Sequence, residues 1–363
     1  MVLSTLKLVN FKNYQEESFH FKEGINCLLG LNGMGKTNLL DAIHYLCMTR
    51  SSQNNTDQDN ILFEEPYFSI IGEFDSGLKV NCYFEQGKKK LFRVNGVEPE
   101  KLSDHIGSIP WVLTTPDDNE IIREGSEVRR KLFDRVISQY DKSYLDELIR
   151  CRKLLNQRNS FLKQNAGKSN YNQKLLQTYD DQLLPLFVGI SAKRKLFLLE
   201  FEEFFTSNYQ DVFKVDEIPG IKYRTKCLDK NFPDQFKEAI KKDLILERTT
   251  MGSHKDDFLF LLNGKPTKKF GSQGQQKTLI IALKLSEFDF LKTKKDEIPL
   301  LLLDDIFDKL DDQRIGHLVE LLSNDKRFSQ IFITDARKER AKNFFGKKKK
   351  VTFFEIENGR ING

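Results

Sequence analysis

Two short motifs that together would form one nucleotide site lie near opposite ends of the chain. The first is a glycine-rich loop from Gly30 to Thr37, which fits the pattern G-x-x-x-x-G-K-[ST] at every fixed position. The second is a run of four leucines, 300–303, followed by Asp304 and Asp305. Lys36 and Asp304 stand 268 positions apart (304 − 36). The spacing predicts an α/β domain whose site closes only after a large insertion.

The glycine-rich loop has the flanks that a phosphate-binding loop needs. Residues 25–29 predict a strand, and residues 38–48 predict a helix with an apolar face. Glycines let backbone N–H groups turn toward phosphate oxygens, and the helix adds its positive N-terminal end. A chance glycine turn is the alternative, and these flanks argue against it. The predicted phosphate contacts are Gly30, Leu31, Asn32, Gly33, Met34, Gly35, Lys36 and Thr37.

Four side chains carry the chemistry that this site predicts. Lys36 would reach the β- and γ-phosphates of ATP, and the Thr37 hydroxyl would ligate Mg²⁺. Asp304 would also hold Mg²⁺, directly or through water, because the carboxyl end of a buried strand is where α/β folds place ligands. Asp305 would orient or deprotonate the attacking water and is the predicted catalytic residue. The wide spacing of the two motifs resembles the layout of ABC-type ATPase heads. In those ATPases the second acid is usually glutamate, so the shorter aspartate predicts slow turnover.

A short polar segment, Ser272, Gln273, Gly274 and Gln275, precedes a helix predicted at 275–291. In a local interpretation, Ser272 caps the helix and Gln275 completes a capping box. In a functional one, exposed donors at a helix N-terminus bind a phosphate. The sequence contains no second nucleotide motif, so that phosphate would belong to another subunit. The two interpretations are compatible.

Hydrophobic periodicity predicts how the chain is divided. Residues 67–97 favour antiparallel strands, whereas residues from about 126 to 209 favour helices. The second helical run, 174–205, is expected to be interrupted near Pro185 and Gly189. The helical part would be either a projecting arm or an ordinary helical subdomain. The predicted fold class is α/β, an ABC-type P-loop ATPase head (1–125 and 210–363) with an inserted helical arm (126–209).

Composition and charge argue against a secreted or membrane-spanning protein and leave nucleic-acid binding open. The net charge is only +5, from 58 basic and 53 acidic residues, so composition alone does not establish nucleic-acid binding. Basic clusters such as 88–90 and 129–131 are candidates for DNA contact, although solvated helix faces and turns explain each one equally well. The five cysteines form no Cys-x-x-Cys pair, which favours a reducing compartment. No signal peptide or membrane span is expected, so a cytoplasmic location without membrane partners is predicted.

Several co-linear segments resemble the RecF family of bacterial DNA-repair proteins over nearly the whole chain. Ser253, Lys255, Lys277 and Lys309 depart from the residues common in that family. The segments that carry the resemblance are 10–14, 30–43, 115–118, 129–134, 248–257, 272–277 and 308–311.

The resemblance implies an ATP-dependent protein that binds DNA, double-stranded and gapped, without sequence specificity and helps to recruit RecR and RecO mediators. It implies an ATP-dependent homodimer with two nucleotides at its interface, and a weak, DNA-stimulated ATPase that acts as a switch. It also implies that Lys12, Asn13 and Asn38 contact ATP, and that Asp308 and Asp311 form a D-loop. A basic groove containing residues 88–90 and 129–130 would bind the DNA backbone.

Three alternatives remain open at this point. A chromosome-structure ATPase head would carry a much longer coiled coil than residues 126–209 provide. A transporter ATPase subunit would carry a Leu-Ser-Gly-Gly-Gln signature and membrane partners. The third alternative is an SMC-like or ABC-type scaffold, gated by ATP but with little turnover, which the aspartate at 305 leaves open.

Overall fold

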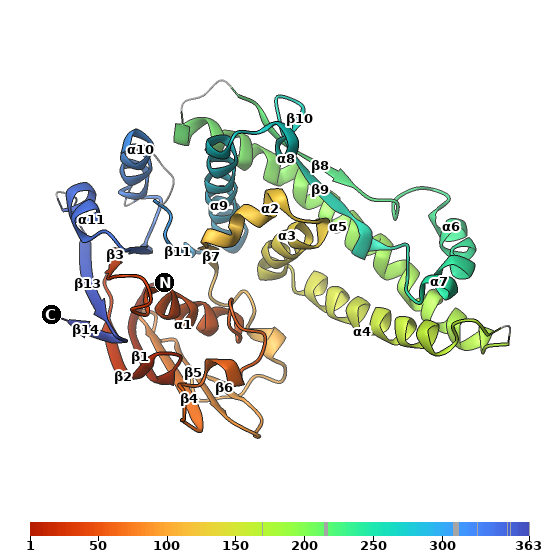
Figure 1. Ribbon diagram of the computed structural model, residues 1–363, viewed down its shortest axis with the longest axis horizontal. Coiled ribbons are helices and arrows are strands. Elements are labelled where there is room, and N and C mark those ends of the chain that lie inside the picture. Colours follow the sequence, from red (N-terminus) through yellow and green to blue (C-terminus); the bar gives the residue numbers. More distant parts are fainter. Residues whose placement is uncertain are drawn as a thin grey trace. The chain divides into compact units, whose positions relative to one another are not determined.

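The computed structural model describes residues 1–168, 170–213, 217–307, 312–324, 326–346, 348 and 350–362. The chain forms two compact units (Figure 1). Unit 1 comprises Met1–Asp118, Asn208–Val215 and Lys277–Gly363, and unit 2 comprises Asn119–Ser207 and Asp216–Gln276. Within the described part of the chain, no helix is long and apolar enough to cross a membrane.

Unit 1 is built on two sheets. The five-stranded sheet has the order β2-β1-β4-β5-β6 and is antiparallel. From Phe68 to Phe74, buried side chains alternate with partly exposed ones. This alternation arises because successive side chains of a strand point to opposite faces of the sheet. The strands are β1 (Leu3–Phe11), β2 (Tyr14–His20), β4 (Tyr67–Phe74), β5 (Lys79–Glu85) and β6 (Leu91–Val94).

The second sheet of unit 1 has the order β14-β13-β3-β12-β11-β7 and is parallel except for β14. Strand β11, four leucines, is buried throughout, as expected for a parallel strand covered on both faces. The strands are β3 (Gly24–Leu29), β7 (Trp111–Thr114), β11 (Leu300–Leu303), β12 (Gln330–Asp335), β13 (Val351–Glu357) and β14 (Arg360–Asn362).

Helix α1 (Lys36–Met48) contacts strands of both sheets. It is buried along almost its whole length, and its apolar residues join one core with Phe68 of the first sheet and Phe332 of the second. This packing fixes the start of α1 against the sheet edge that carries the glycine-rich loop. Unit 1 also contains α10 (Asp312–Leu322), α11 (Lys338–Phe345), the part of α9 (Gln273–Lys295) from Lys277 onward and the end of α5 (Gln173–Phe213) from Asn208.

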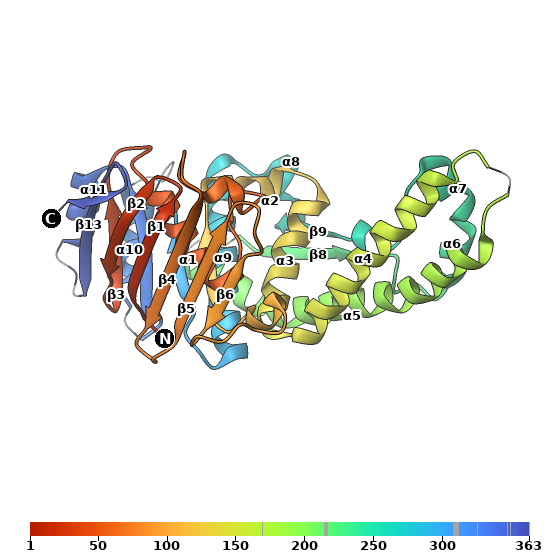
Figure 2. The same ribbon diagram turned by 90° about the horizontal axis from the view of Figure 1, so that it is seen from below.

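Unit 2 combines helices with a small antiparallel sheet of order β10-β9-β8. Helices α4 and α5 lie side by side in both views (Figure 2), and Lys193 of α5 forms an ion pair with Glu147 of α4 at 2.9 Å. Phe133 of α3 packs on Phe258 of β9, with ring centroids 4.4 Å apart. The elements are α2 (Glu120–Arg123), α3 (Ser126–Tyr140), α4 (Lys142–Gln164), α5 (Gln173–Phe213), β8 (Pro219–Arg224), α6 (Phe232–Glu238), α7 (Ile240–Leu246), β9 (Asp257–Leu262), β10 (Lys265–Pro266) and α8 (Thr267–Phe270).

Two expectations are corrected by these units. Residues 216–276 cluster with 119–207, whereas the sequence assigned them to the head. The reason is that β9 packs its phenylalanines on α3, which periodicity within each segment cannot reveal. Helix α5 also continues through Pro185 without the expected interruption. Leu183 and Phe187 are both buried on either side of the exposed proline, so packing holds the helix despite the missing N–H donor.

Candidate nucleotide site

The candidate site lies at the carboxyl edge of the parallel sheet of unit 1. Strands β3, β12 and β11 are adjacent and parallel, with Leu29 paired to Asp335 and Leu303 paired to Ile333. The carboxyl ends of these three strands therefore meet at the same edge of the sheet. The glycine-rich loop follows β3 there, Asp304 follows β11, and the last residues of β12 lie between them. The sheet closes the 268-residue gap (304 − 36) that separates the two motifs in the sequence.

The conformation of the loop requires glycine at defined positions. Gly33 and Gly35 have φ values of +83° and +113°, which side-chain-bearing residues rarely adopt. A Cβ atom on Gly30 would lie 2.3 Å from the backbone oxygen of Ile356 in β13. The absence of a side chain at Gly30 therefore allows the loop to lie close to β13.

Lys36 is buried at the first position of α1 and bends back over the loop. Its Nζ donates to the carbonyl oxygens of Gly30 at 2.7 Å and Leu31 at 2.8 Å. Burial lowers the pKa of Lys36, and the nearby carboxylates of Asp304, Asp305 and Asp335 oppose that effect. Because an ammonium group has three donors, one N–H remains for a phosphate oxygen after the two carbonyls are served.

Thr37 and Asp304 meet across the site. The Thr37 hydroxyl lies 3.0 Å from Oδ1 and 2.9 Å from Oδ2 of Asp304, so the two predicted metal ligands are in direct contact. Asp304 is 5% exposed, and no ion pair involving it occurs among the described residues. Burial raises the pKa of Asp304, which two hydroxyl donors and Lys36 partly offset. A buried carboxylate that contacts only hydroxyls gains strongly from a cation.

This donor set fits Mg²⁺. The ion prefers oxygen ligands and usually takes one or two from the protein, with phosphates and water completing its shell. Thr37 and Asp304 would hold the ion.

Thr334, at the end of β12, connects both acidic residues and was missed by sequence reasoning. Its hydroxyl donates to Oδ1 of Asp304 at 2.7 Å and accepts from the backbone N–H of Asp305 at 2.8 Å. Asp305 has a φ of +46°, in the left-handed region. Thr334 thus fixes the backbone turn that aims Asp305. The sequence signal that could have identified Thr334 was a threonine at the end of the apolar run that forms β12, the strand next to β11.

Asn13 and Asn38 both lie against the loop, and their contact with ATP stays a prediction. The Asn13 side chain donates to the Met34 carbonyl at 3.2 Å and accepts from Asn38 Nδ2 at 2.8 Å. The neighbouring Tyr14 hydroxyl donates to the Gly35 carbonyl at 2.9 Å. These bonds connect the turn between β1 and β2 to the loop and support its shape.

Lys12 differs from the other predicted ATP contacts because its charge is already paired. Its Nζ lies 2.7 Å from Asp41 of α1, and both side chains are buried. Burial acts to raise the pKa of Asp41, but Lys12 and His44 outweigh it and the pKa is lowered. Lys12 therefore anchors the β1–β2 turn to α1, and its contact with ATP stays a prediction.

The polar segment before α9 belongs to unit 2 and forms the expected capping box. Gln275 donates its backbone N–H to Ser272 Oγ at 3.2 Å, and Ser272 returns the bond to Gln275 Oε1 at 2.7 Å. Ser272 and Gln273 are exposed, whereas the Gln275 amide also donates to Glu217. The action of Ser272–Gln275 on a second subunit's nucleotide stays a prediction. Asp308 and Asp311, the predicted D-loop residues, lie outside the described residues.

The basic segments proposed for DNA contact are partly occupied with internal partners. Lys90 donates to the Thr49 carbonyl at 2.7 Å and pairs with Asp57 at 2.9 Å. Arg129 is buried and forms an ion pair with Asp257 at 2.8 Å. These two side chains stabilise their own units, which corrects the expectation that they contact DNA. Lys88 remains largely exposed, with only a surface ion pair to Glu85.

The chain matches known proteins over its full length. The family described as RecF/RecN/SMC N terminal domain matches residues 2–361. The protein named DNA replication and repair protein RecF is 44% identical in Cytophaga hutchinsonii over 365 residues, covering 99% of this chain and 96% of the relative. The Flavobacterium johnsoniae protein of the same name is 43% identical over 343 residues, covering 94% and 95%.

Solved structures agree with these relatives. A structure described as the recombination mediator protein RecF-ATPrS in the RecFOR pathway has a TM-score of 0.87 and 30% identity, covering 99% of this chain and 97% of that one. A more distant Smc head bound to a domain of ScpA has a TM-score of 0.57 at 14% identity, covering 100% and 96%. The second match shows the shared ABC-type head fold alone.

Proposed function

Because the chain belongs to the family of proteins named DNA replication and repair protein RecF, we propose that it is an ATP-dependent DNA-binding protein of recombinational and replication-gap repair. The observation that carries the proposal is the contact of Thr37 with Asp304 beside Lys36, which assembles an ATP site from both ends of the sequence. The name of the relatives, and the match to the solved RecF-ATPrS structure, support it.

In the proposed site each residue has one task. The loop from Gly30 to Gly35 would bind phosphate oxygens through its backbone N–H groups. Lys36 would exchange a carbonyl partner for a phosphate oxygen, and Thr37 and Asp304 would hold Mg²⁺. The ion would neutralise the negative charge that develops on the phosphate during hydrolysis. Thr334 would keep Asp305 aimed at the attacking water.

In the proposed mechanism the protein acts as a homodimer that closes when ATP is bound. The signature residues Ser272 and Gln273 are exposed, so they are accessible to the nucleotide of a second subunit. Closure would gather DNA-binding surfaces, and hydrolysis would reverse it. DNA affinity would depend on phosphate contacts, so it would fall with salt and vary little with sequence. RecR- and RecO-like mediators are the proposed protein partners, in line with the RecFOR pathway to which the solved RecF-ATPrS structure belongs.

A specific observation favours a second candidate, an ATP-gated scaffold with negligible turnover. Asp305 is one methylene shorter than the usual glutamate, and its backbone is held in a left-handed turn by Thr334. If reach limits the reaction, Asp305→Glu will hydrolyse ATP faster than the wild type. Equal or lower turnover in Asp305→Glu would show that reach is not the limit.

The proposal is tested by fluorescence anisotropy of gapped DNA with ATP, ADP or no nucleotide. We expect ATP-dependent binding by the wild type that Lys36→Met abolishes. Lys7→Met, which removes an exposed lysine of β1 in the same unit, is the matched control and should bind as the wild type does. Equal binding with and without nucleotide would refute ATP gating of DNA contact and favour a protein-recruitment role.

A further inference from the structure

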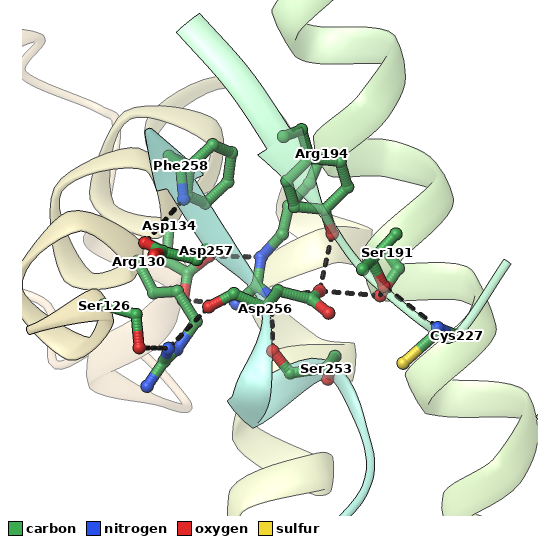
Figure 3. A network of polar contacts seen from close by, with 12 residues as sticks. Ser126, Arg130, Asp134, Ser191, Arg194, Cys227, Ser253, Asp256, Asp257 and Phe258 are labelled. Carbon is green, nitrogen blue, oxygen red and sulfur yellow. Dashed lines mark hydrogen bonds and ion pairs between the residues drawn. The ribbon is translucent and has the colours of Figure 1, made fainter. Parts of the chain in front are cut away.

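Two sequence segments have no part in the nucleotide site, yet the structure brings them together in unit 2. Residues 126–134 lie on α3, and residues 248–257 connect α7 to β9. Arg130 donates to Ser126 Oγ at 2.7 Å and to the backbone oxygen of Asp256 at 2.6 Å (Figure 3). This pair of bonds ties the end of Arg130 to the residue that follows Lys255.

A buried network holds the 248–257 segment in one conformation. Arg194 is 2% exposed and bonds Asp134, Asp256 and the Ser253 carbonyl at 2.7 to 2.9 Å (Figure 3). Gly252 has a φ of +133°, and a Cβ there would lie 2.6 Å from the Phe187 ring. The backbone that carries Lys255 is therefore positioned by contacts on several sides.

The other end of the segment is fixed in the same way. Arg158, fully buried, donates to Asp243 at 2.7 Å and to Thr249 Oγ1 at 2.9 Å. The Arg248 backbone N–H donates to the Asp243 carbonyl at 3.1 Å. Arg248 stands next to these anchored residues and its own side chain is exposed.

Three cations, Arg130, Arg248 and Lys255, form what we define as the cationic cluster. Arg248 and Lys255 are exposed and Arg130 is half-buried, and none of them forms an ion pair within the described part of unit 2. Burial lowers the pKa of Lys255, as do the neighbouring charges of Arg248 and Arg130, with Asp243 acting in the opposite sense. The backbone geometry agrees: His254 donates to the Thr249 carbonyl at 3.1 Å and Arg130 donates to the Asp256 carbonyl at 2.6 Å, so the residues on either side of Lys255 are bonded to the Arg248 end of the segment and to Arg130.

The acidic groups nearby already have cations of their own. The Glu127 carboxylate pairs with Lys131, and the buried carboxylates pair with arginines behind the cluster. Those buried pairs are Arg129–Asp257, Arg158–Asp243 and Arg194–Asp256. Within the described part of unit 2, Glu127, Asp134, Asp256 and Asp243 act on Arg130 or Lys255 only at longer range, so the three cations have no ion-pair partner of their own. Such an arrangement is costly by itself and becomes favourable when an anion binds.

We propose that Arg130, Arg248 and Lys255 form a phosphodiester-binding site on unit 2 that contacts the DNA backbone. The proposal rests on the proposed function, because DNA is the polyanion that function supplies. Two guanidinium groups favour phosphate, whose oxygens accept paired N–H donors. Fixing Arg130 and the backbone that carries Arg248 and Lys255 before binding reduces the ordering cost of the contact. The site reads no base edges, so it adds affinity without sequence specificity.

The test is the salt dependence of duplex DNA binding in the presence of ATP, for the wild type and for Arg248→Ala/Lys255→Ala. Each phosphate contact contributes about 0.9 to the slope of log affinity against log salt. We therefore expect the double variant to show a slope shallower by about 1.8, with the same loss on unrelated sequences. Lys222→Ala/Lys265→Ala, which removes two exposed lysines of β8 and β10 in the same unit, should keep the wild-type slope. Circular dichroism and thermal unfolding confirm that both variants fold.

The outcomes separate this inference from the proposed function. No DNA binding by the wild type would refute the proposed function itself. Wild-type binding with an unchanged slope in the cluster variant, or an equal change in the control, would overturn the inference alone. Thermal unfolding with added inorganic phosphate at constant ionic strength tests for a small phosphate ligand. Phosphate could raise the melting temperature of the wild type but not of the cluster variant, while both proteins show the same salt slope for DNA binding. In that case the site binds small phosphates and the DNA assignment is overturned.

Discussion

The buried carboxylate of Asp304 predicts that one substitution will both stabilise the ligand-free protein and remove its response to MgATP. Asn at 304 keeps an oxygen for Thr334 and offers an N–H to Thr37, so every hydrogen bond is preserved. The charge, whose burial raises the pKa of Asp304, is removed. We expect Asp304→Asn to unfold at the same temperature as the wild type or above it when no nucleotide is present.

MgATP reverses that order. At a hundredfold excess over its dissociation constant, a ligand stabilises the folded state by about 2.7 kcal/mol. For a domain of about 150–250 residues, 1 kcal/mol shifts the melting temperature by roughly 2–4 °C, so wild-type protein should gain about 5–10 °C. Asp304→Asn should gain no more with MgATP than with ATP and EDTA. Differential scanning fluorimetry measures both quantities.

Asp335→Asn is the matched control, because the same change at the same sheet edge should act in the opposite sense. Asp335 is 1% exposed, but Arg340 bonds it twice, at 2.7 and 2.9 Å. Removing this charge weakens both charge-assisted bonds between Arg340 and residue 335, which costs about 1.5–3 kcal/mol. A lowered ligand-free melting temperature for Asp304→Asn, or a full MgATP shift in that variant, would refute the reasoning.

The sign of the pH dependence follows from the raised pKa of Asp304. The folded state holds the proton of this group more tightly than the unfolded state does, so the group favours folding at acidic pH. That contribution is lost as pH rises through the folded pKa. The gain from Asp304→Asn should therefore be greatest at neutral pH and vanish where Asp304 is protonated. A gain that grows as pH falls would contradict the assignment.

Three further changes have outcomes that the structure determines. Gly30→Ala should abolish ATP binding in a filter-binding assay, because its Cβ meets the Ile356 oxygen at 2.3 Å; tight binding would show that the loop adapts. Arg158→Leu leaves two buried aspartates without their cation and should cost about 3–5 kcal/mol in urea unfolding, whereas a loss below 1 kcal/mol would refute the network's role. Burial lowers the pKa of His254 to about 4, so stability should fall between about pH 6.5 and 4, and His254→Gln should flatten that slope.

Local motifs predicted which residues the candidate site brings together, because much of its geometry is encoded in short segments. Gly33 and Gly35 are needed for positive φ, and Lys36 and Thr37 follow directly on the helix. Asp304 could be placed because a fully apolar strand precedes it. Thr334 could not, because its role depends on β12 lying next to β11, and strand order is a property of the whole sheet.

The same reasoning failed for charged residues whose partners are distant in sequence. Arg129 and Lys90 stand in basic runs that are typical of nucleic-acid surfaces, yet each is paired within its unit. The partner of Arg129 is 128 positions away. A single-sequence pattern records charge, whereas burial and pairing decide whether that charge faces solvent. The boundary of unit 2 was missed for a related reason, since β9 joins α3 only in three dimensions.

Charge balance explains why the buried networks and the exposed cluster of unit 2 belong together. Each network places one arginine between two aspartates and so leaves one negative charge in excess: Arg158 with Asp180 and Asp243, and Arg194 with Asp134 and Asp256. Burial and the neighbouring acids raise the pKa of Asp180, in agreement with that excess, although Arg158 opposes them. An apolar core of the same volume would be at least as stable. The networks instead fix the 248–257 segment and offset, from inside, part of the repulsion among the cations in front of them. Loss of a buried arginine should therefore weaken DNA binding even though no buried arginine can touch DNA.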